Sequence, residues 1–222
     1  MKYEVEIKSL LQTKENADKL RKKLVEQSIE LANKYSQLNH YFLSNGDFAK
    51  LEEKLLSLFD DEEKKKLKKI LEKGKGHSIR TREMNREVFF VVKASVDDTT
   101  SSNGILRMEF EEKVKIAMDE LDKIIEDAGF EYQAKWSRDR EEYSKGDFYI
   151  TIDKNAGYGY LSEFEIQTED KDKLLEAKQR ILNFMNELGL KELPQDRLER
   201  MFEFYNENWR DYYGTENVFN IE

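Results

Sequence analysis

The first residues whose types and spacing could do chemistry are Glu4, Glu6 and Lys8, which alternate with two β-branched residues. Successive side chains of a β-strand point to opposite faces, so this spacing predicts a strand over residues 2–9 with its charges on one face. Carboxylate oxygens bind hard divalent cations, and an ammonium group binds phosphate oxygens. A single Glu-x-Glu-x-Lys pattern is, however, also typical of a sheet face exposed to solvent.

The same arrangement recurs in further segments that have the composition of strands. Their charged residues are Arg80, Arg82, Lys93, Arg107, Glu109, Glu111, Arg138, Arg140, Asp153, Glu163 and Glu165. A solvated face would mix Thr, Ser, Gln and Lys, whereas this set concentrates Arg and Glu, often at paired i, i+2 positions. The apolar faces of these strands need cover, which the intervening helices can supply. The charged faces are then expected to point inward and to line a closed barrel.

The remaining elements follow from hydrophobic periodicity and turn signals. Besides residues 2–9, strands are predicted over 35–43, 77–84, 87–95, 105–114, 130–143, 147–153 and 160–167. Helices are predicted over 13–33, 47–73 (as two short helices), 117–128, 171–189 and 195–213. Mostly antiparallel strands with interspersed helices indicate the α+β class.

Composition excludes several classes of site. The net charge of −9 argues against a protein that binds duplex nucleic acid through overall basicity. The absence of cysteine excludes disulfides and thiolate metal sites, and two histidines are too few for a multi-histidine metal site. Without an apolar leader or a membrane-spanning run, we expect a soluble, cytoplasmic protein with no membrane partner. Any metal would be held by oxygen, which favours Mg²⁺, Mn²⁺ or Ca²⁺.

An interior lined with charged groups is costly unless those groups are paired, hydrated or coordinating a ligand. Carboxylates collect divalent cations, and guanidinium and ammonium groups collect phosphate oxygens. A polyanion with its divalent cation satisfies both sets at once. The expected ligand is therefore a small molecule that contains a triphosphate.

The ordered set of motifs resembles a known family. The segment Glu4-Val5-Glu6-Ile7-Lys8 is similar to the N-terminal signature of the CYTH proteins, also called triphosphate tunnel metalloenzymes. The resemblance continues through Gln37 to Phe42, Ile79-Arg80-Thr81-Arg82, Lys93, Arg107 to Glu111, Arg138-Asp139-Arg140 with Tyr143, Asp153, and Glu163-Phe164-Glu165. It covers about residues 1–190.

The resemblance implies a fold and a domain organisation. The family has an eight-stranded antiparallel closed β-barrel, or tunnel, with helices packed outside, so we expect this domain over residues 1–190. A helical insertion over 47–75 follows the second strand and is longer than expected; it could be a lid, a partner surface or padding. Residues 191–222 would form a helical extension that packs on the same domain, covering a tunnel mouth or forming a homodimer surface.

The resemblance also implies roles for the charged residues. The expected metal ligands, for Mg²⁺ or Mn²⁺, are Glu4, Glu6, Asp153, Glu163 and Glu165. The expected phosphate-binding residues are Lys8, Arg80, Arg82, Lys93, Arg107, Arg138 and Arg140. Glu109 and Glu111, expected to help with a second ion or to position water, join Glu4, Glu6 and Lys8 as candidate catalytic residues. Asn39 stands where relatives often carry Asp and is given no metal role.

Three functions remain open from the sequence. The favoured one is a metal-dependent triphosphatase that hydrolyses the terminal phosphate of tripolyphosphate, a nucleoside triphosphate or thiamine triphosphate. The second is a class IV-type adenylyl cyclase that makes cyclic AMP and pyrophosphate from ATP, although no base-recognition pocket can be identified. The third is a non-catalytic module that binds polyphosphate or triphosphate, against which the full carboxylate set argues.

Overall fold

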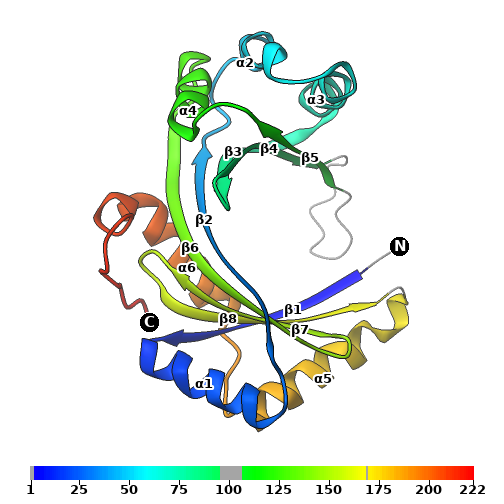
Figure 1. Ribbon diagram of the computed structural model, residues 1–222, viewed down its shortest axis with the longest axis vertical. Coiled ribbons are helices and arrows are strands. Elements are labelled where there is room, and N and C mark those ends of the chain that lie inside the picture. The colour runs from blue at the N-terminus through cyan, green and yellow to red at the C-terminus, as the bar shows by residue number, and fades with distance from the viewer. Residues whose placement is uncertain (1–2, 96–106, 169) are drawn as a thin grey trace. The chain divides into compact units, whose positions relative to one another are not determined.

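The computed structural model describes residues 3–95, 107–168 and 170–222 of the 222-residue chain. The chain divides into two compact units (Figure 1). Unit 1 comprises Met1–Ser36 and Ser137–Glu222, and unit 2 comprises Gln37–Trp136. The predicted loop over residues 96–104 lies outside the described residues.

The strands form an eight-stranded sheet in the order β1-β8-β7-β6-β2-β3-β4-β5. Six pairs of neighbouring strands are antiparallel: β1 with β8, β8 with β7, β7 with β6, β2 with β3, β3 with β4, and β4 with β5. The strands are β1 (Tyr3–Gln12), β2 (Leu31–Phe42), β3 (Lys75–Met84), β4 (Glu87–Ser95), β5 (Arg107–Val114), β6 (Tyr132–Lys145), β7 (Phe148–Asn155) and β8 (Gly159–Thr168). The predicted α+β class and antiparallel sheet are confirmed. Closure of the sheet would join β1 of unit 1 to β5 of unit 2, and it stays a prediction.

In unit 1, two helices cover the apolar face of β1, β8 and β7 (Figure 1). They are α1 (Lys14–Glu26) and α5 (Leu174–Glu187). Thr13 begins α1 by accepting a hydrogen bond from the Asn16 amide, which satisfies one of the free N–H groups of the first turn. The buried side chains of this core include Ile7, Leu20, Leu24, Ile150, Phe164 and Ile181.

In unit 2, three helices lie on one side of β3, β4 and β5 (Figure 1). Their buried side chains belong to the core of these strands. The helices are α2 (Phe48–Leu55), α3 (Asp61–Lys73) and α4 (Met118–Asp127), with a short 3₁₀ helix, η1 (Leu56–Leu58), between the first two. Asp60 and Glu63 form a capping box at the start of α3. Six residues of 51–71 are buried in the core: Leu51, Leu55, Phe59, Leu67, Ile70 and Leu71. The segment predicted as an insertion therefore contributes buried side chains to the core of unit 2.

The C-terminal segment packs on the turn between β7 and β8 in unit 1. It contains α6 (Gln195–Asn208) and the 3₁₀ helix η3 (Trp209–Asp211). Another 3₁₀ helix of unit 1, η2 (Lys171–Lys173), directly precedes α5. The Phe219 amide donates to the Gly157 carbonyl over 2.9 Å. Gly159 has φ +69°, and a Cβ there would lie 2.1 Å from the carbonyl oxygen of Gln12. Only glycine allows this approach between the turn and the end of β1.

One boundary expectation is wrong. The helix predicted over 13–33 ends at Glu26, and β2 already begins at Leu31. The chain turns at Ser28, whose φ is +59°, so that Ile29 returns to the core as a buried residue. Apolar residues before and after this turn happen to have the spacing of a helix, so the sequence pattern predicted that the helix continues. None of the helices in the described part of the chain combines the length and apolar character that a membrane-spanning helix needs.

Candidate functional site

Unit 1 carries one cluster of the predicted residues on the sheet face opposite its helices. On β1, Glu6 and Lys8 flank the buried Ile7, and on β8 Glu163 and Glu165 flank the buried Phe164. Side chains alternate along a strand, so these charges lie on the face that α1 and α5 do not cover. We call this set the unit 1 face: Glu6, Lys8, Arg138, Arg140, Glu142, Asp153, Glu163 and Glu165.

The register of β1 and β8 places two kinds of charge pair side by side on the unit 1 face. Lys8 lies opposite Glu163, and its Nζ is 3.1 Å from a carboxylate oxygen of that residue. Lys8 also forms an ion pair with Glu6. Glu6, in contrast, lies directly opposite Glu165, so that two carboxylates are neighbours across the strands. Like charges in this position are destabilising unless a cation lies with them.

Arg140 on β6 joins the carboxylates of two other strands. Its guanidinium donates to both oxygens of Asp153 over 2.8 and 2.6 Å, and to Glu163 over 2.7 Å. Asp153 is opposite Arg140 in the register and its side chain is only 1% exposed. This two-pronged geometry is the strong form of an Arg–carboxylate pair. Asp153 therefore already has a cationic partner within the protein.

The charges of the unit 1 face control one another's protonation. Burial raises the pKa of Glu163, but attraction to Lys8, Arg140 and Arg138 lowers it by more, so the net pKa lies below its ordinary value. Burial lowers the pKa of Arg140, and Asp153 and Glu163 raise it by more. Both residues therefore stay charged near neutral pH.

Three neutral or acidic residues of this region, Asn155, Glu142 and Thr151, were not found from the sequence. Asn155 lies opposite Arg138 and accepts a hydrogen bond from it over 3.1 Å. Glu142 accepts from the hydroxyl of Tyr35 over 2.7 Å. Thr151 lies between Glu142 and Glu163 in the register, and its hydroxyl is buried without a partner among the described residues. The sequence signal for Glu142 and Thr151 was the alternation of residues in "REEY" (140–143) and "TID" (151–153). In these stretches only Arg140 and Asp153 were assigned roles.

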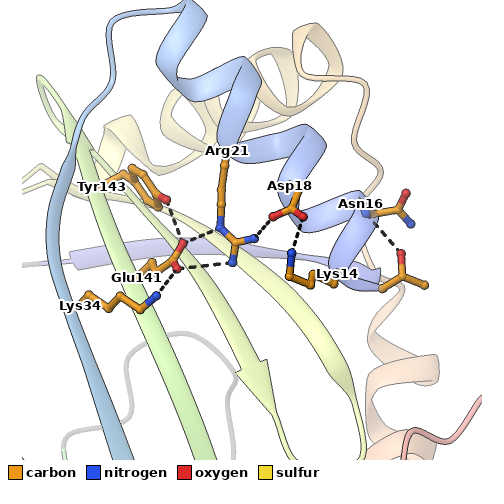
Figure 2. A network of polar contacts seen from close by, with 8 residues as sticks. Lys14, Asn16, Asp18, Arg21, Lys34, Glu141 and Tyr143 are labelled. Atoms are coloured by element: carbon orange, nitrogen blue, oxygen red, sulfur yellow. Dashed lines mark hydrogen bonds and ion pairs between the residues drawn. The ribbon is translucent and has the colours of Figure 1, made fainter. Parts of the chain in front are cut away.

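A network on the opposite side of β6 fixes the strand that carries Arg140 (Figure 2). Glu141, which is 8% exposed, accepts hydrogen bonds from Arg21 over 2.8 Å, Lys34 over 3.0 Å and Tyr143 over 3.0 Å. Burial raises the pKa of Glu141, and these donors lower it by more. Arg21 also reaches Asp18 over 2.6 Å within α1. The network thus ties β6 to α1 and β2.

Unit 2 carries the second cluster, which we call the unit 2 face. It consists of Asn39, Tyr41, Arg80, Arg82, Lys93, Glu109 and Glu111. Arg82 donates to Asn39 over 3.0 Å and to Glu111 over 2.5 Å. Lys93 lies opposite Glu109, with 2.9 Å between the Nζ and the carboxylate. The apolar side chains that alternate with these residues belong to the core beneath the helices.

Arg80 is the most buried cation of the unit 2 face, at 9% exposure. One of its terminal nitrogens donates to the Tyr41 hydroxyl over 2.8 Å, and its guanidinium lies 5.2 Å from the centre of the Tyr41 ring. Its Nε is buried and has no hydrogen-bond partner among the described residues. A buried N–H without a partner is costly, so this group is suited to an acceptor supplied by a ligand.

The predicted site residues thus fall into two groups, each brought together within its own unit. Glu4 and Arg107 lie on β1 and β5, but their side chains are outside the described part of the structure. Whether both groups serve one cavity stays a prediction. His40 lies on β2, as predicted. Its side chain is 4% exposed and faces the core, where it contacts Asp122.

The unit 1 face fits a divalent cation in its donor chemistry. The groups of this face that can bind a cation are carboxylate oxygens, which Mg²⁺ and Mn²⁺ prefer as ligands. Glu6 and Glu165 are direct partners in the register, with no cationic residue between them. Among the described side chains, no group of three or more acidic or histidine residues is gathered as a ready metal site. Glu4, two residues before Glu6 on the same strand, is the next carboxylate in line.

A pocket of about 830 Å³ lies in unit 1, where the C-terminal segment passes the ends of β6, β7 and β8. Its lining includes Lys14, Arg138, Lys154, Tyr160, Glu216 and Asn217. Lys154 is paired with Glu216 over 2.7 Å, and Lys14 with Asp18 over 2.8 Å. The volume is that of a small-molecule site. Arg138 belongs both to this pocket and to the unit 1 face.

Comparisons with known proteins identify the family and the fold of the chain. The family model of the CYTH domain matches residues 2–197. None of the curated proteins matches the chain. The PH1819 protein of Pyrococcus horikoshii OT3 is 23% identical over 87% of this chain and 94% of that chain, with a TM-score of 0.54.

Two other solved structures are similar. A conserved hypothetical protein of Pyrococcus furiosus is 18% identical over 85% of this chain and 92% of that chain, with a TM-score of 0.54. A candidate adenylate cyclase of Vibrio parahaemolyticus is 17% identical over 90% of this chain and 98% of that chain, with a TM-score of 0.53. At these identities the likeness is one of fold.

Proposed function

The chain belongs to the CYTH family, and from this premise we propose that it is a divalent-metal-dependent triphosphatase. Its substrate would be tripolyphosphate, a nucleoside triphosphate or thiamine triphosphate. The observation that carries the proposal is the opposed pair of carboxylates, Glu6 and Glu165, of which Glu6 has an ion pair with Lys8 and Glu165 accepts a hydrogen bond from the neutral side chain of Gln167. A protein that only bound a polyanion would be weakened by such a pair, whereas a metal-dependent enzyme needs it.

The unit 1 face would hold the metal. We assign the ligands to Glu4, Glu6, Glu163, Glu165 and Asp153, with Mg²⁺ or Mn²⁺ as the ion. When bound, the ion supplies neutralisation of phosphate charge and polarisation of phosphoryl oxygens. Lys8 and Arg140 already contact Glu163 over 3.1 and 2.7 Å, so they can hold this carboxylate ionised and aligned.

The unit 2 face would bind phosphate. Arg80 offers a buried N–H without a partner, and Arg82 offers a planar fork held by Asn39 and Glu111. Guanidinium groups match phosphate oxygens in geometry as well as charge. Lys93 and Arg107 would extend this surface, as would Arg138 and Arg140 in unit 1.

Phosphoryl transfer asks the protein mainly for positioning and electrostatic stabilisation. In the proposed reaction, water attacks the terminal phosphorus and the bond from that phosphorus to the bridging oxygen breaks. The diphosphate part of the substrate leaves with the bridging oxygen, and orthophosphate forms as the attacking water loses a proton. Glu109 and Glu111 would orient the water. Their present partners, Lys93 and Arg82, are also phosphate-binding candidates, so phosphate can take over the cations and release the carboxylates.

A nucleotide cyclase is the second candidate, and the pocket beside Arg138 is the observation that favours it. A cyclase must bind a nucleoside as well as phosphates, and a volume of about 830 Å³ is large enough for one. The ribose 3′-oxygen would then attack the α-phosphorus and pyrophosphate would leave.

One experiment tests both candidates. The purified protein is incubated with Mg²⁺ or Mn²⁺ and, separately, with tripolyphosphate, thiamine triphosphate and ATP, and the products are resolved by chromatography. Orthophosphate is the expected product. Cyclic AMP with pyrophosphate would replace the proposal by the cyclase, and intact ligand that nevertheless binds would leave a non-catalytic module.

A further inference from the structure

A buried carboxylate lies on the core side of unit 2, behind the strands that carry Arg80 and Arg82. It belongs to Asp122 of α4, whose side chain is 2% exposed. Asp122 accepts hydrogen bonds from His40 over 2.6 Å and from Thr81 over 2.6 Å. It also accepts one from the Tyr132 hydroxyl over 2.8 Å. Three elements of the sheet, β2, β3 and β6, thus meet at one carboxylate of a covering helix.

The position of these donors in the register gives the cluster its significance. His40 and Thr81 lie opposite each other on β2 and β3. The next pairs on either side are Tyr41 with Arg80, and Asn39 with Arg82. Because side chains alternate, the pair bound to Asp122 points into the core and both flanking pairs point to the unit 2 face. Asp122 therefore holds the one residue pair that separates the two arginines.

A slip of one residue in this ladder would move every side chain to the other face. A hydrophobic residue at the place of Asp122 would resist such a slip only weakly, since apolar contacts are not directional. Hydrogen bonds to a buried carboxylate have both direction and a high cost of loss. Burial raises the pKa of Asp122, and its hydrogen bonds to His40, Thr81 and Tyr132, with attraction to His40, lower it by more, so the group remains an acceptor.

We propose that Asp122 is a positioning residue for phosphate binding: it fixes the register of β2 and β3 so that Arg80 and Arg82 present their guanidinium groups together to the triphosphate. This inference rests on the proposed function of the unit 2 face. It adds a residue that touches no ligand and acts through Thr81 and His40. Its role differs from that of the core residues around it, whose loss would lower stability without aiming a side chain.

The test uses the full chain with Mg²⁺ and tripolyphosphate, and measures kcat, KM, the Kd by calorimetry and the melting temperature. Asp122→Asn keeps the size of the side chain and removes its charge and acceptor symmetry. We expect KM and Kd to rise about tenfold, because a displacement near 1 Å of a binding group has effects of this order or larger, while kcat changes less than about twofold. Thr81→Val, which removes one donor with little change of shape, should shift KM and Kd in the same direction by less.

Matched controls come from the same helix. Ile125→Val and Leu121→Ala alter buried apolar side chains of α4 that belong to the core of unit 2. They should lower the melting temperature and leave KM unchanged. If Asp122→Asn does not fold, Thr81→Val decides. An unchanged KM in the folded Asp122 and Thr81 variants, or an equal rise in the controls, would overturn the proposal.

The arginine variants separate this inference from the function on which it rests. In an Arg80→Ala, Arg82→Ala background, Asp122→Asn should cause no further loss of affinity, since the groups it aims are gone. If the arginine variants weaken binding and Asp122→Asn does not, the inference fails alone. If the arginine variants leave binding unchanged, the unit 2 face does not bind phosphate, and both fail.

Discussion

Glu6 of β1 lies directly opposite Glu165 of β8, so two carboxylates are neighbours in the register of a face on which Lys8 is the cation paired with Glu6. Cross-strand like charges are destabilising in the absence of a cation. The fold tolerates this arrangement at the place where the proposed function needs a divalent ion.

Replacing one of the two carboxylates should therefore separate stability from activity. For Glu165→Gln we expect a melting temperature equal to or above that of the wild type without metal, because repulsion is removed. Turnover should fall by roughly a hundredfold or more, since a metal ion supplies several kcal/mol of charge stabilisation. Mg²⁺ should also raise the melting temperature of the wild type more than that of the variant.

Thermal shift with and without Mg²⁺, together with steady-state rates, measures both effects. Glu176→Gln, an exposed residue of α5, is the control and should behave as wild type. A Glu165 variant with full metal-dependent activity would remove this residue from the metal site.

Arg82 tests the phosphate role of the unit 2 face. Arg82→Lys keeps the charge and loses the fork that Asn39 and Glu111 hold, whereas Arg82→Ala loses both. A charge-assisted hydrogen bond is worth about 1.5–3 kcal/mol, so Arg82→Ala should raise KM by roughly ten- to a hundredfold. The KM of Arg82→Lys should lie between that of the wild type and that of Arg82→Ala. Equal KM values for the three proteins in steady-state assays would contradict the assignment.

The Glu141 network predicts a pH dependence of stability. The pKa of Glu141 is below its ordinary value of 4.5 in the folded protein. Its contribution is therefore complete above pH 4.5 and is lost as the pH falls through the lowered pKa. At pH 7, Glu141→Gln should lower the free energy of unfolding by about 1–3 kcal/mol, because it removes the negative charge and one of the two acceptor oxygens that Arg21 and Lys34 use.

Urea unfolding at pH 7 and pH 3 checks this prediction. The difference between wild type and Glu141→Gln should shrink as the pH is lowered below 4.5, because protonation of the native carboxyl removes its charge. Glu187→Gln, an exposed change on α5, should show no such difference. A gap that stays constant with pH would mean that the carboxylate charge is not what stabilises β6.

The fold was largely predictable because one face of each strand is buried. Because of that constraint, apolar and charged residues alternate along each strand. This alternation was sufficient to locate the strands and the charged residues on them. The pairing of Arg140 with Asp153 was not predicted, because it depends on the exact position of the turn: the two turn residues are Gly146 and Asp147, and they fix the register of β6 and β7. The helix end at Glu26 was missed because apolar residues continue past the turn at Ser28.

Other relationships could not be predicted. Glu6 and Glu165 come from opposite ends of the chain, and no local turn sets their register. Asp122 stands in a helix whose other buried side chains are the apolar Met118, Leu121 and Ile125. Its carboxylate is buried because donors from three distant strands meet it, and such a meeting leaves no periodic signal in the sequence.

The helices of 48–73 offer the last test, since they form a large part of the core of unit 2. Leu67 of α3 is 0% exposed, and Leu67→Ala should cost about 2–5 kcal/mol through the cavity it leaves. Hydrogen exchange should then rise in peptides from β3, β4 and β5 and stay unchanged in those from β7 and β8, because the cavity lies in unit 2. Lys68→Ala, the exposed neighbour, is the control. Wild-type protection of β3 to β5 in the Leu67 variant would instead show that this segment is dispensable cover, as an insertion would be.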